Sequence, residues 1–374
     1  MKAFFTFSLT LCLTFSFAQE LALVREDGLF GYINKSGEYV IKPQFTKAKS
    51  FSEGYAAAQK GKLWGFIDPS GNWTIAPEYN KVKYFSSGYA LVLKDDQWHY
   101  IDSSGKKLET AATEKYYDFQ KGVALIRQND KIGIIGTNGK VILEPIFDEI
   151  KKFRNGHAKV RKGELWGMIN NQGKTVIPIE YEEIGNALNT SGVYGKKGGS
   201  FGIIHNGSFN TIEGADKVWN FHGNSGLTYA RKNKKTGFVN SKGEWAIAPT
   251  FDKVRAFSNG LAPAAKGKSW GYINTKGEIV IDFQYKDAEI FAENGLAPVK
   301  EKYWGFIDTS GNMIIPAEYN ITAGLAFLSG KNEKGFLGDL ARLKSKKGWG
   351  FFNAKGELLG NKWYQNAEPF VHIK

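Results

Sequence analysis

A basic residue recurs at the same position of each sequence repeat. A row of such cations is the arrangement in this chain that most clearly suggests a chemical role, the binding of anions. Ten such residues recur about every 34 residues: Arg25, Lys60, Lys94, Arg127, Arg161, Lys196, Lys232, Lys266, Lys300 and Lys344. Stacked units would turn them into a row in space that attracts anions. The formal net charge of +13 favours the same partners. Alternatively, these lysines only keep exposed turns soluble.

Other residue types that often carry chemistry form no recognisable motif. The chain has five histidines: His99, His157, His205, His222 and His372. No two of them have the spacing of metal ligands. The only cysteine is Cys12, so the sequence predicts neither a disulfide nor a cysteine metal site beyond residue 18. We therefore expect no catalytic residue, no metal and no cofactor.

Residues 185–226 depart most from the regular pattern of the chain. Glycines and lysines cluster there: Gly192, Gly195, Gly198, Gly199, Lys196 and Lys197. Either one repeat has decayed, or the surface is specialised. A carbohydrate-active enzyme with its acids gathered in this region is therefore an alternative function, and it would need two carboxylates that face each other.

A repeated Trp-Gly motif supplies the elements that must position these residues. Trp64-Gly65-Phe66-Ile67-Asp68 is one copy, and Trp304-Gly305-Phe306-Ile307-Asp308 is another. Six residues after the first glycine stands a second, as at Gly71, which is typical of a hairpin turn closed by a residue with positive φ. Ten such units follow one another, so we expect a tandem-repeat architecture rather than separate domains.

Each unit predicts three short antiparallel strands. Aromatic and aliphatic residues alternate before the hairpin, and a β-branched stretch follows it, often ended by proline as at Pro77. A Gly-x-Ala strand such as Gly88-Tyr89-Ala90 completes the unit. We expect that the Trp-Gly position requires glycine because an aromatic ring from a neighbouring unit packs over its backbone. The alternative is that the tryptophans form a ladder on which a ligand stacks.

At these residues the chain resembles the WG-repeat family (also written KWG repeats) of exported bacterial proteins. The resemblance covers residues 20–374. It implies a β-rich repeat and frequent export, and it carries no agreed enzymatic activity, so no catalytic residue can be transferred to this chain.

The repeats could form an open or a closed array. Three strands in about 34 residues are few for a four-stranded propeller blade, and ten blades exceed the usual four to eight. We therefore expect an all-β, open, twisted superhelix. The alternative is a closed, propeller-like ring, in which Leu21 to Val24 would complete the last unit.

The first residues have the composition of a targeting segment. Lys2 precedes an apolar run from Ala3 to Phe17, and Ala18 is a small residue before Gln19. This pattern predicts a signal peptide at 1–18, followed by a single repeat domain at 19–374. Leu11 is too large for a lipoprotein motif at Cys12. No other stretch has membrane-spanning length.

These features predict an exported, non-enzymatic protein whose repeat surface binds a polymer or scaffolds a protein partner. We expect the location to be periplasmic, outer-membrane-associated or extracellular. The expected partner is a protein or an anionic polysaccharide, and nucleic acid is not favoured. A structural protein of the cell envelope is a further alternative.

Overall fold

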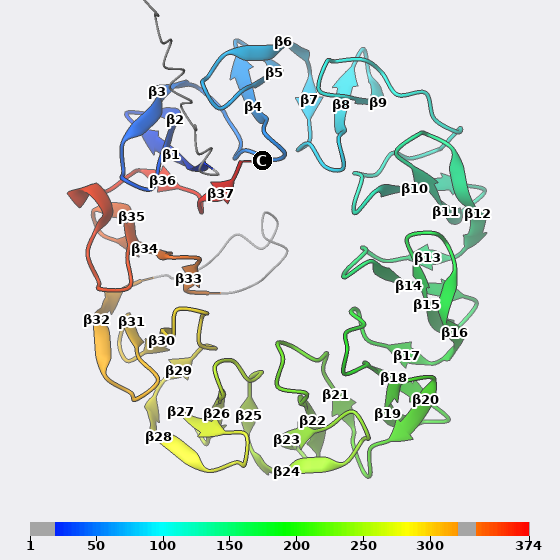
Figure 1. Cartoon of the computed structure of the whole chain (residues 1–374), viewed down its shortest axis with the longest axis vertical. Helices are drawn as coiled ribbons and strands as arrows, with labels where there is room; N and C mark the ends of the chain where they lie inside the picture. Colours follow the sequence, from blue (N-terminus) through cyan, green and yellow to red (C-terminus); the bar gives the residue numbers. More distant parts are fainter. Residues whose placement is uncertain (1–18, 321–333, 374) are drawn as a thin grey trace, which may run out of the picture.

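The repeats form a closed ring of small antiparallel sheets. The structure is a computed structural model that describes residues 19–320 and 334–373, and within this part of the chain it contains ten sheets. Figure 1 shows them arranged around a central axis in chain order, with one edge of each sheet toward the axis and the other toward the outside. Each sheet is one blade of a β-propeller.

The strands are assigned to blades from the inner edge outward. Blade 1 contains β36 (Asn366–Ala367), β1 (Glu20–Glu26), β2 (Leu29–Ile33) and β3 (Tyr39–Phe45), and β37 (Val371–His372) also pairs with β1. Blade 2 contains β4 (Ala56–Lys60), β5 (Leu63–Ile67) and β6 (Trp73–Tyr79), and blade 3 contains β7 (Lys81–Val82), β8 (Ala90–Lys94) and β9 (Gln97–Ile101). Blade 4 contains β10 (Val123–Gln128), β11 (Lys131–Gly136) and β12 (Val141–Phe147), and blade 5 contains β13 (Glu149–Ile150), β14 (His157–Lys162), β15 (Leu165–Asn170) and β16 (Thr175–Tyr181).

Blades 6 to 10 follow in the same way. Blade 6 contains β17 (Glu183–Ile184), β18 (Val193–Lys197), β19 (Ser200–His205) and β20 (Ser208–Thr211), and blade 7 contains β21 (Lys217–Val218), β22 (Thr228–Lys232), β23 (Lys235–Val239) and β24 (Trp245–Phe251). Blade 8 contains β25 (Lys253–Val254), β26 (Leu261–Lys266), β27 (Ser269–Asn274) and β28 (Ile279–Tyr285), and blade 9 contains β29 (Asp287–Ala288), β30 (Ala297–Lys300), β31 (Trp304–Ile307) and β32 (Met313–Tyr319). Blade 10 contains β33 (Phe336–Leu337), β34 (Leu340–Ser345) and β35 (Gly348–Phe352), and the 3-10 helix η1 (Leu359–Asn361) follows β35.

The prediction of an open superhelix is wrong, because the two ends of the chain meet in blade 1. Val24 of β1 pairs with Ala367 of β36, and Glu20 pairs with His372 of β37. The prediction counted three strands in each unit, whereas a regular blade has a fourth, inner strand of only two residues, such as β25. Because this strand is so short, about 34 residues are enough for a propeller blade.

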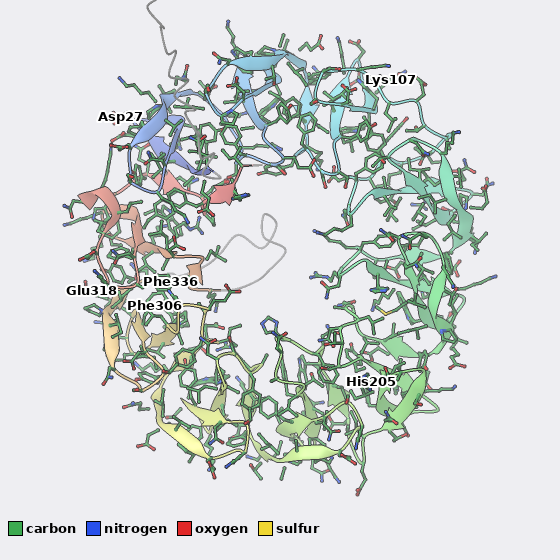
Figure 2. The ribbon with its side chains drawn as sticks, viewed as in Figure 1. Asp27, Lys107, His205, Phe306, Glu318 and Phe336 are labelled. Carbon is green, nitrogen blue, oxygen red and sulfur yellow. The ribbon has the colours of Figure 1, made fainter. Side chains whose placement is uncertain are left out.

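The hydrophobic core is divided into clusters that lie between neighbouring blades. Phe66 of blade 2 and Phe85 of blade 3 are both fully buried, and their ring centroids lie 4.8 Å apart. Phe306 and Phe336 make the same kind of contact between blades 9 and 10 at 5.2 Å (Figure 2). Each blade therefore depends on both of its neighbours for burial of its apolar faces, which a closed ring provides to every blade.

The Trp-Gly glycine is bare for a different reason from the one that the sequence indicated. A Cβ atom at Gly65 would lie 2.5 Å from the carbonyl oxygen of Ile75 and 2.7 Å from the nitrogen of Pro77. Both belong to β6, the outer strand of the same blade, where the register with β5 is shifted. The outer strand of the same blade, and not a ring from a neighbouring unit, excludes a side chain here.

The predicted hairpins are confirmed. Gly71 has a φ of +88°, and the Asp68 carboxylate accepts hydrogen bonds from the backbone nitrogens of Ser70 and Asn72, each at 2.9 Å. Because successive strands of a blade are antiparallel, these hairpins lie on one face of the ring, here called the hairpin face. The turns between the second and third strands of each blade lie on the opposite face, here called the turn face.

Among the described residues four blades depart from the four-stranded pattern, because blades 2 and 4 have no inner strand and blades 3 and 10 have no outer strand. Blade 3 has no outer strand and blade 4 has no inner strand among the described residues, since residues 107–120 cross between them without strand structure (Figure 2 labels Lys107 near the start of this segment). His99 occupies the Trp-Gly glycine position of blade 3. Since no outer strand presses on this position, a side chain fits there.

In the part of the chain that the structure describes, no helix is both long and apolar enough to span a membrane. The expected signal peptide, with Cys12, and most of the insertion before β33 lie outside the described residues.

Candidate functional site

The ten predicted basic residues all occupy the same turn of their blades. Each stands in or at the end of the strand that precedes the Trp-Gly strand, as Lys266 does at the end of β26, where it pairs with Ser269 of β27. These turns lie on the turn face, so the ring does arrange the ten residues as a circular row. Their surroundings, however, divide the row into two halves.

In blades 3 to 7 the predicted cation is neutralised by a carboxylate. The ion pairs are Lys94–Glu78 at 2.7 Å, Arg127–Asp130 at 2.5 Å, Arg161–Glu149 at 3.6 Å, Lys196–Glu182 at 3.3 Å and Lys232–Glu213 at 3.5 Å. The Lys94 ammonium lowers the pKa of the Glu78 carboxyl chiefly by hydrogen bonding to it. This half of the row therefore offers little net attraction to an anion.

In blades 8, 9, 10, 1 and 2 the cation forms no ion pair within the described residues. The five residues are Lys266, Lys300, Lys344, Arg25 and Lys60, and they are contiguous because the ring is closed. Lys300 and Lys344 lie 5.8 and 5.4 Å from the ring centroids of Trp304 and Trp349. These aromatic contacts leave the positive charges uncompensated.

Of the five pairing carboxylates, only Glu78 lies on the outer strand of the preceding blade, whereas Asp130, Glu149, Glu182 and Glu213 lie elsewhere in the chain. Glu78 of β6 reaches Lys94 of the next blade. The equivalent residues before Lys60, Lys266 and Lys300 are Gln44, Thr250 and Gln284, which carry no charge. The carboxylate that pairs with Lys94 therefore has no counterpart before these three lysines.

The turns of blades 8, 9 and 10 carry further lysines and form what we call the basic arc. It consists of Lys266, Lys268, Lys300, Lys302, Lys344, Lys346 and Lys347, with Glu301 as the one acidic residue in these turns. All of these lysines are exposed except Lys300, which is half-buried. In contrast, the turn of blade 3 contains Asp95 and Asp96. The positive charge of the row is therefore concentrated on one side of the ring.

The tryptophans of the Trp-Gly motifs do not form a free stacking ladder. Trp270 and Trp304 are each only 8% exposed. The Arg255 guanidinium lies 4.6 Å from the centroid of Trp270, and the Lys159 ammonium lies 4.4 Å from that of Trp166. The ring faces are thus used for packing and for cation–π contacts within the protein.

Residues 185–226 are more regular than the sequence indicated. They include β18, β19 and β20 and the inner strand of blade 7, with ordinary pairing between Gly195 and Gly202. The two acidic residues of this region are Glu213 and Asp216. Asp216 binds the Arg231 side chain at 2.5 Å, and Glu213 binds Lys232, so both are engaged in ion pairs.

Sequence reasoning missed a cavity beside the irregular segment 107–120. It has a volume of about 390 Å³ and is lined by residues of blades 3, 4 and 5, among them Lys83, Tyr117 and Lys151. Two signals pointed to it: the replacement of the repeat glycine by His99 and the lack of a proline where the outer strand of blade 3 should end. In the described part of the chain, no group of three or more histidine, cysteine or acidic residues is placed to hold a metal ion.

Comparison with known proteins identifies a family and a fold. The model of the WG containing repeat matches residues 30–64, 64–98, 132–166, 166–189, 237–268, 270–303 and 304–321. Together these matches span more than half of the chain, and they pass over residues 99–131. No curated protein sequence matches the chain significantly.

Solved structures resemble the chain at low sequence identity. A crystal structure of the eukaryotic initiation factor is 10% identical, with a TM-score of 0.50 over 95% of this chain and 98% of that one. Hsv2p of Kluyveromyces lactis is 10% identical with a TM-score of 0.25 over 70% and 96% of the two chains. PorZ of Porphyromonas gingivalis, a bacterial surface component of the type-IX secretion system, is 11% identical with a TM-score of 0.26 over 95% and 58%. The first of these similarities indicates the fold alone.

Proposed function

Because the chain belongs to the WG containing repeat family and closes into a ring with a basic arc on one face, we propose that it is an exported, non-enzymatic binding or scaffold protein. Its partner is an anionic polysaccharide or an acidic surface of another protein. The observation that carries this proposal is the uneven charge of the turn face, where the cations of blades 3 to 7 are paired and those of the basic arc are not.

Physical chemistry supports an extended anion rather than a small one at this arc. The lysines stand in three consecutive turns of the ring, so their fields add over the surface between them. Exposed charges of this kind act through a screened field, and the attraction falls with added salt. A polymer with repeated negative charges can contact several turns at once and gain from each of them.

The ion pairs of residues 185–226 support a binding protein over the alternative enzyme. A glycosidase needs two carboxylates that face each other across the substrate, one of which is held protonated. Glu213 and Asp216 instead each bind a cation, Lys232 and Arg231, so neither is placed opposite a second carboxylate as such a mechanism requires.

A pair of matched triple variants tests the basic arc. Lys266→Gln, Lys300→Gln and Lys344→Gln remove three unpaired charges, whereas Lys94→Gln, Lys196→Gln and Lys232→Gln remove three paired charges from the same turn position. We expect the first triple to elute from a heparin column at clearly lower salt than the wild type, and the second to shift much less. Thermal melting of both variants should stay close to wild type, because the turns are exposed.

A third variant controls for total charge on the other side of the ring. Lys242→Gln, Lys276→Gln and Lys355→Gln change exposed lysines of the hairpin face. If all three triples lower the elution salt equally, general basicity suffices and the proposal of a specific arc is wrong. If none of them changes retention, no anionic partner binds through the turn face.

Export is proposed from residues 1–18 alone. An apolar run after Lys2 and the small residue Ala18 support cleavage after Ala18, which would give a chain that starts at Gln19. N-terminal sequencing of material recovered outside the producing cell measures this. An intact Met1, or a lipid-modified start at Cys12, would contradict it.

A further inference from the structure

The cavity beside segment 107–120 exists because the residues of blade 4 that would form its inner strand do not pair fully with β10. In blade 3 the backbone nitrogen of Lys83 donates to the Leu91 carbonyl at 2.8 Å, and in blade 5 that of Lys151 donates to Lys159 at 3.0 Å. The equivalent residues of blade 4 are Tyr117 and Leu125. No such bond joins this pair, although both residues lie in the described part of the chain.

The separated segment is nevertheless held in place at both ends. The Glu114 nitrogen donates to the Arg127 carbonyl at 2.9 Å, and the Tyr100 hydroxyl donates to the Tyr117 carbonyl at 2.5 Å. The Gln128 side chain also donates to the Ala112 carbonyl at 2.7 Å. A defined backbone therefore borders the space, and the cavity, which is partly open to solvent, is a regular feature of this junction.

The walls and the rim of the cavity differ in chemistry. Apolar and aromatic walls come from three blades and consist of Leu91, Tyr116, Tyr117, Val123, Leu125 and Phe153. The rim carries Lys83, Lys115, Lys151 and Lys152, with Gln120 and with Asp118 as the one carboxylate among the lining residues. Four ammonium groups against one carboxylate favour a ligand that carries negative charge.

We propose that this cavity binds a phosphorylated sugar or a molecule of that size and chemistry. Its volume lies at the lower end of the range of small-molecule sites, about 300–1,000 Å³, which suits a single ring with one charged group. Tyrosine and phenylalanine rings supply flat apolar surfaces for the sugar ring, and lysine ammonium groups donate to phosphate oxygens as point charges. This site is separate from the basic arc and does not depend on it.

Of the four lysines, Lys83 and Lys152 are the best placed to be tested. Lys151 forms an ion pair with Glu149, and Lys115 lies 5.2 Å from the Tyr117 ring centroid, so both have other contacts. Lys83 and Lys152 are exposed and make no ion pair within the described residues. Their replacement by glutamine therefore removes charge with little effect on packing.

Isothermal titration calorimetry of the full chain with glucose 6-phosphate and glucose 1-phosphate tests the proposal, with glucose and inorganic phosphate as reference ligands. We expect both sugar phosphates to bind more tightly than either reference. The double variant Lys83→Gln, Lys152→Gln should weaken binding about tenfold or more, since it removes two charged donors to the phosphate oxygens. The control double variant Lys253→Gln, Lys286→Gln, at inner positions of blades 8 and 9, should bind like wild type.

A filling variant separates a cavity from a merely basic surface. Leu125→Trp, or Gln120→Trp if the first variant does not fold, occupies the space and removes no charge. We expect loss of sugar phosphate binding with unchanged retention on heparin, while the basic arc variant should show the reverse. The proposal is overturned if neither sugar phosphate binds at millimolar concentration, if inorganic phosphate binds equally well, or if folded filling variants still bind.

Discussion

At the scale of the residue, the most informative position is the glycine of each Trp-Gly motif. Its requirement is steric and comes from the same blade, because the outer strand bulges toward it, as Ile75 and Pro77 do at Gly65. Blade 3, which lacks an outer strand, has a larger residue, His99, at this position, whereas in blade 10, which also lacks one, the side chains of Leu358 and Trp363 crowd the glycine Gly350. The residue at this position therefore reflects how closely the outer part of the blade approaches it.

This account predicts a contrast between two adjacent blades. Gly65→Val places a side chain against the backbone of β6 and should lower the free energy of unfolding by about 1–3 kcal/mol, the usual cost of overpacking. His99→Val introduces the same residue at the same register position without that obstacle, and should change stability by less than about 1 kcal/mol. Urea denaturation measures both. Equal effects of the two substitutions would show that the outer strand is not the cause.

At the scale of the element, the sequence predicted the hairpins and most long strands correctly and missed the inner strands. Hairpin turns have local signatures, such as Asp68 and Gly71, because their backbone angles need particular residues. An inner strand such as β25 has two residues and only one neighbour in its own blade, so no periodic pattern marks it. Without these strands a unit seemed too short for a blade, and the open array was wrongly preferred.

The candidate sites show the same division between local and non-local information. The ten basic positions could be found because they recur in sequence. Which of them are neutralised depends on carboxylates whose positions vary from blade to blade, as with Glu78, 16 positions before Lys94, and Asp130, in the same turn as Arg127. The cavity depends on strands that are absent, and only the loss of the pattern at residues 99–131 marks it.

At the scale of the whole molecule, the seam in blade 1 holds the ring closed. The Gln365 nitrogen donates to the Arg25 carbonyl at 3.0 Å, and the Glu368 nitrogen donates to Leu23 at 2.8 Å. The Lys362 ammonium pairs with Glu26 at 2.8 Å. Hydrogen bonds from Lys362 and then from Tyr39 lower the pKa of the Glu26 carboxyl below 4.5. The seam thus combines backbone pairing with one partly exposed ion pair.

The seam should therefore weaken in acid. Since the folded protein lowers the pKa of Glu26, its contribution is present above about pH 4.5 and is lost as the pH falls through the folded-state value. Glu26→Gln should cost up to about 1 kcal/mol at pH 7, because the pair is partly exposed, and should make no difference well below pH 4. Urea denaturation at the two pH values measures this, with amide exchange of β1 as a local probe. A cost that persists in acid would contradict the role of the carboxylate.

The seam also determines the order in which the blades can form while the chain is synthesised. Most blades are built from one stretch of about 34 residues, so all of their strands become available at nearly the same time. β1 instead waits for β36 and β37, which are synthesised after all the other strands of the ring, and until then its inner edge is an unpaired template for other strands. The step that closes the ring is thus the last one, and the time before it is when a nascent chain is most exposed to pairing with another copy.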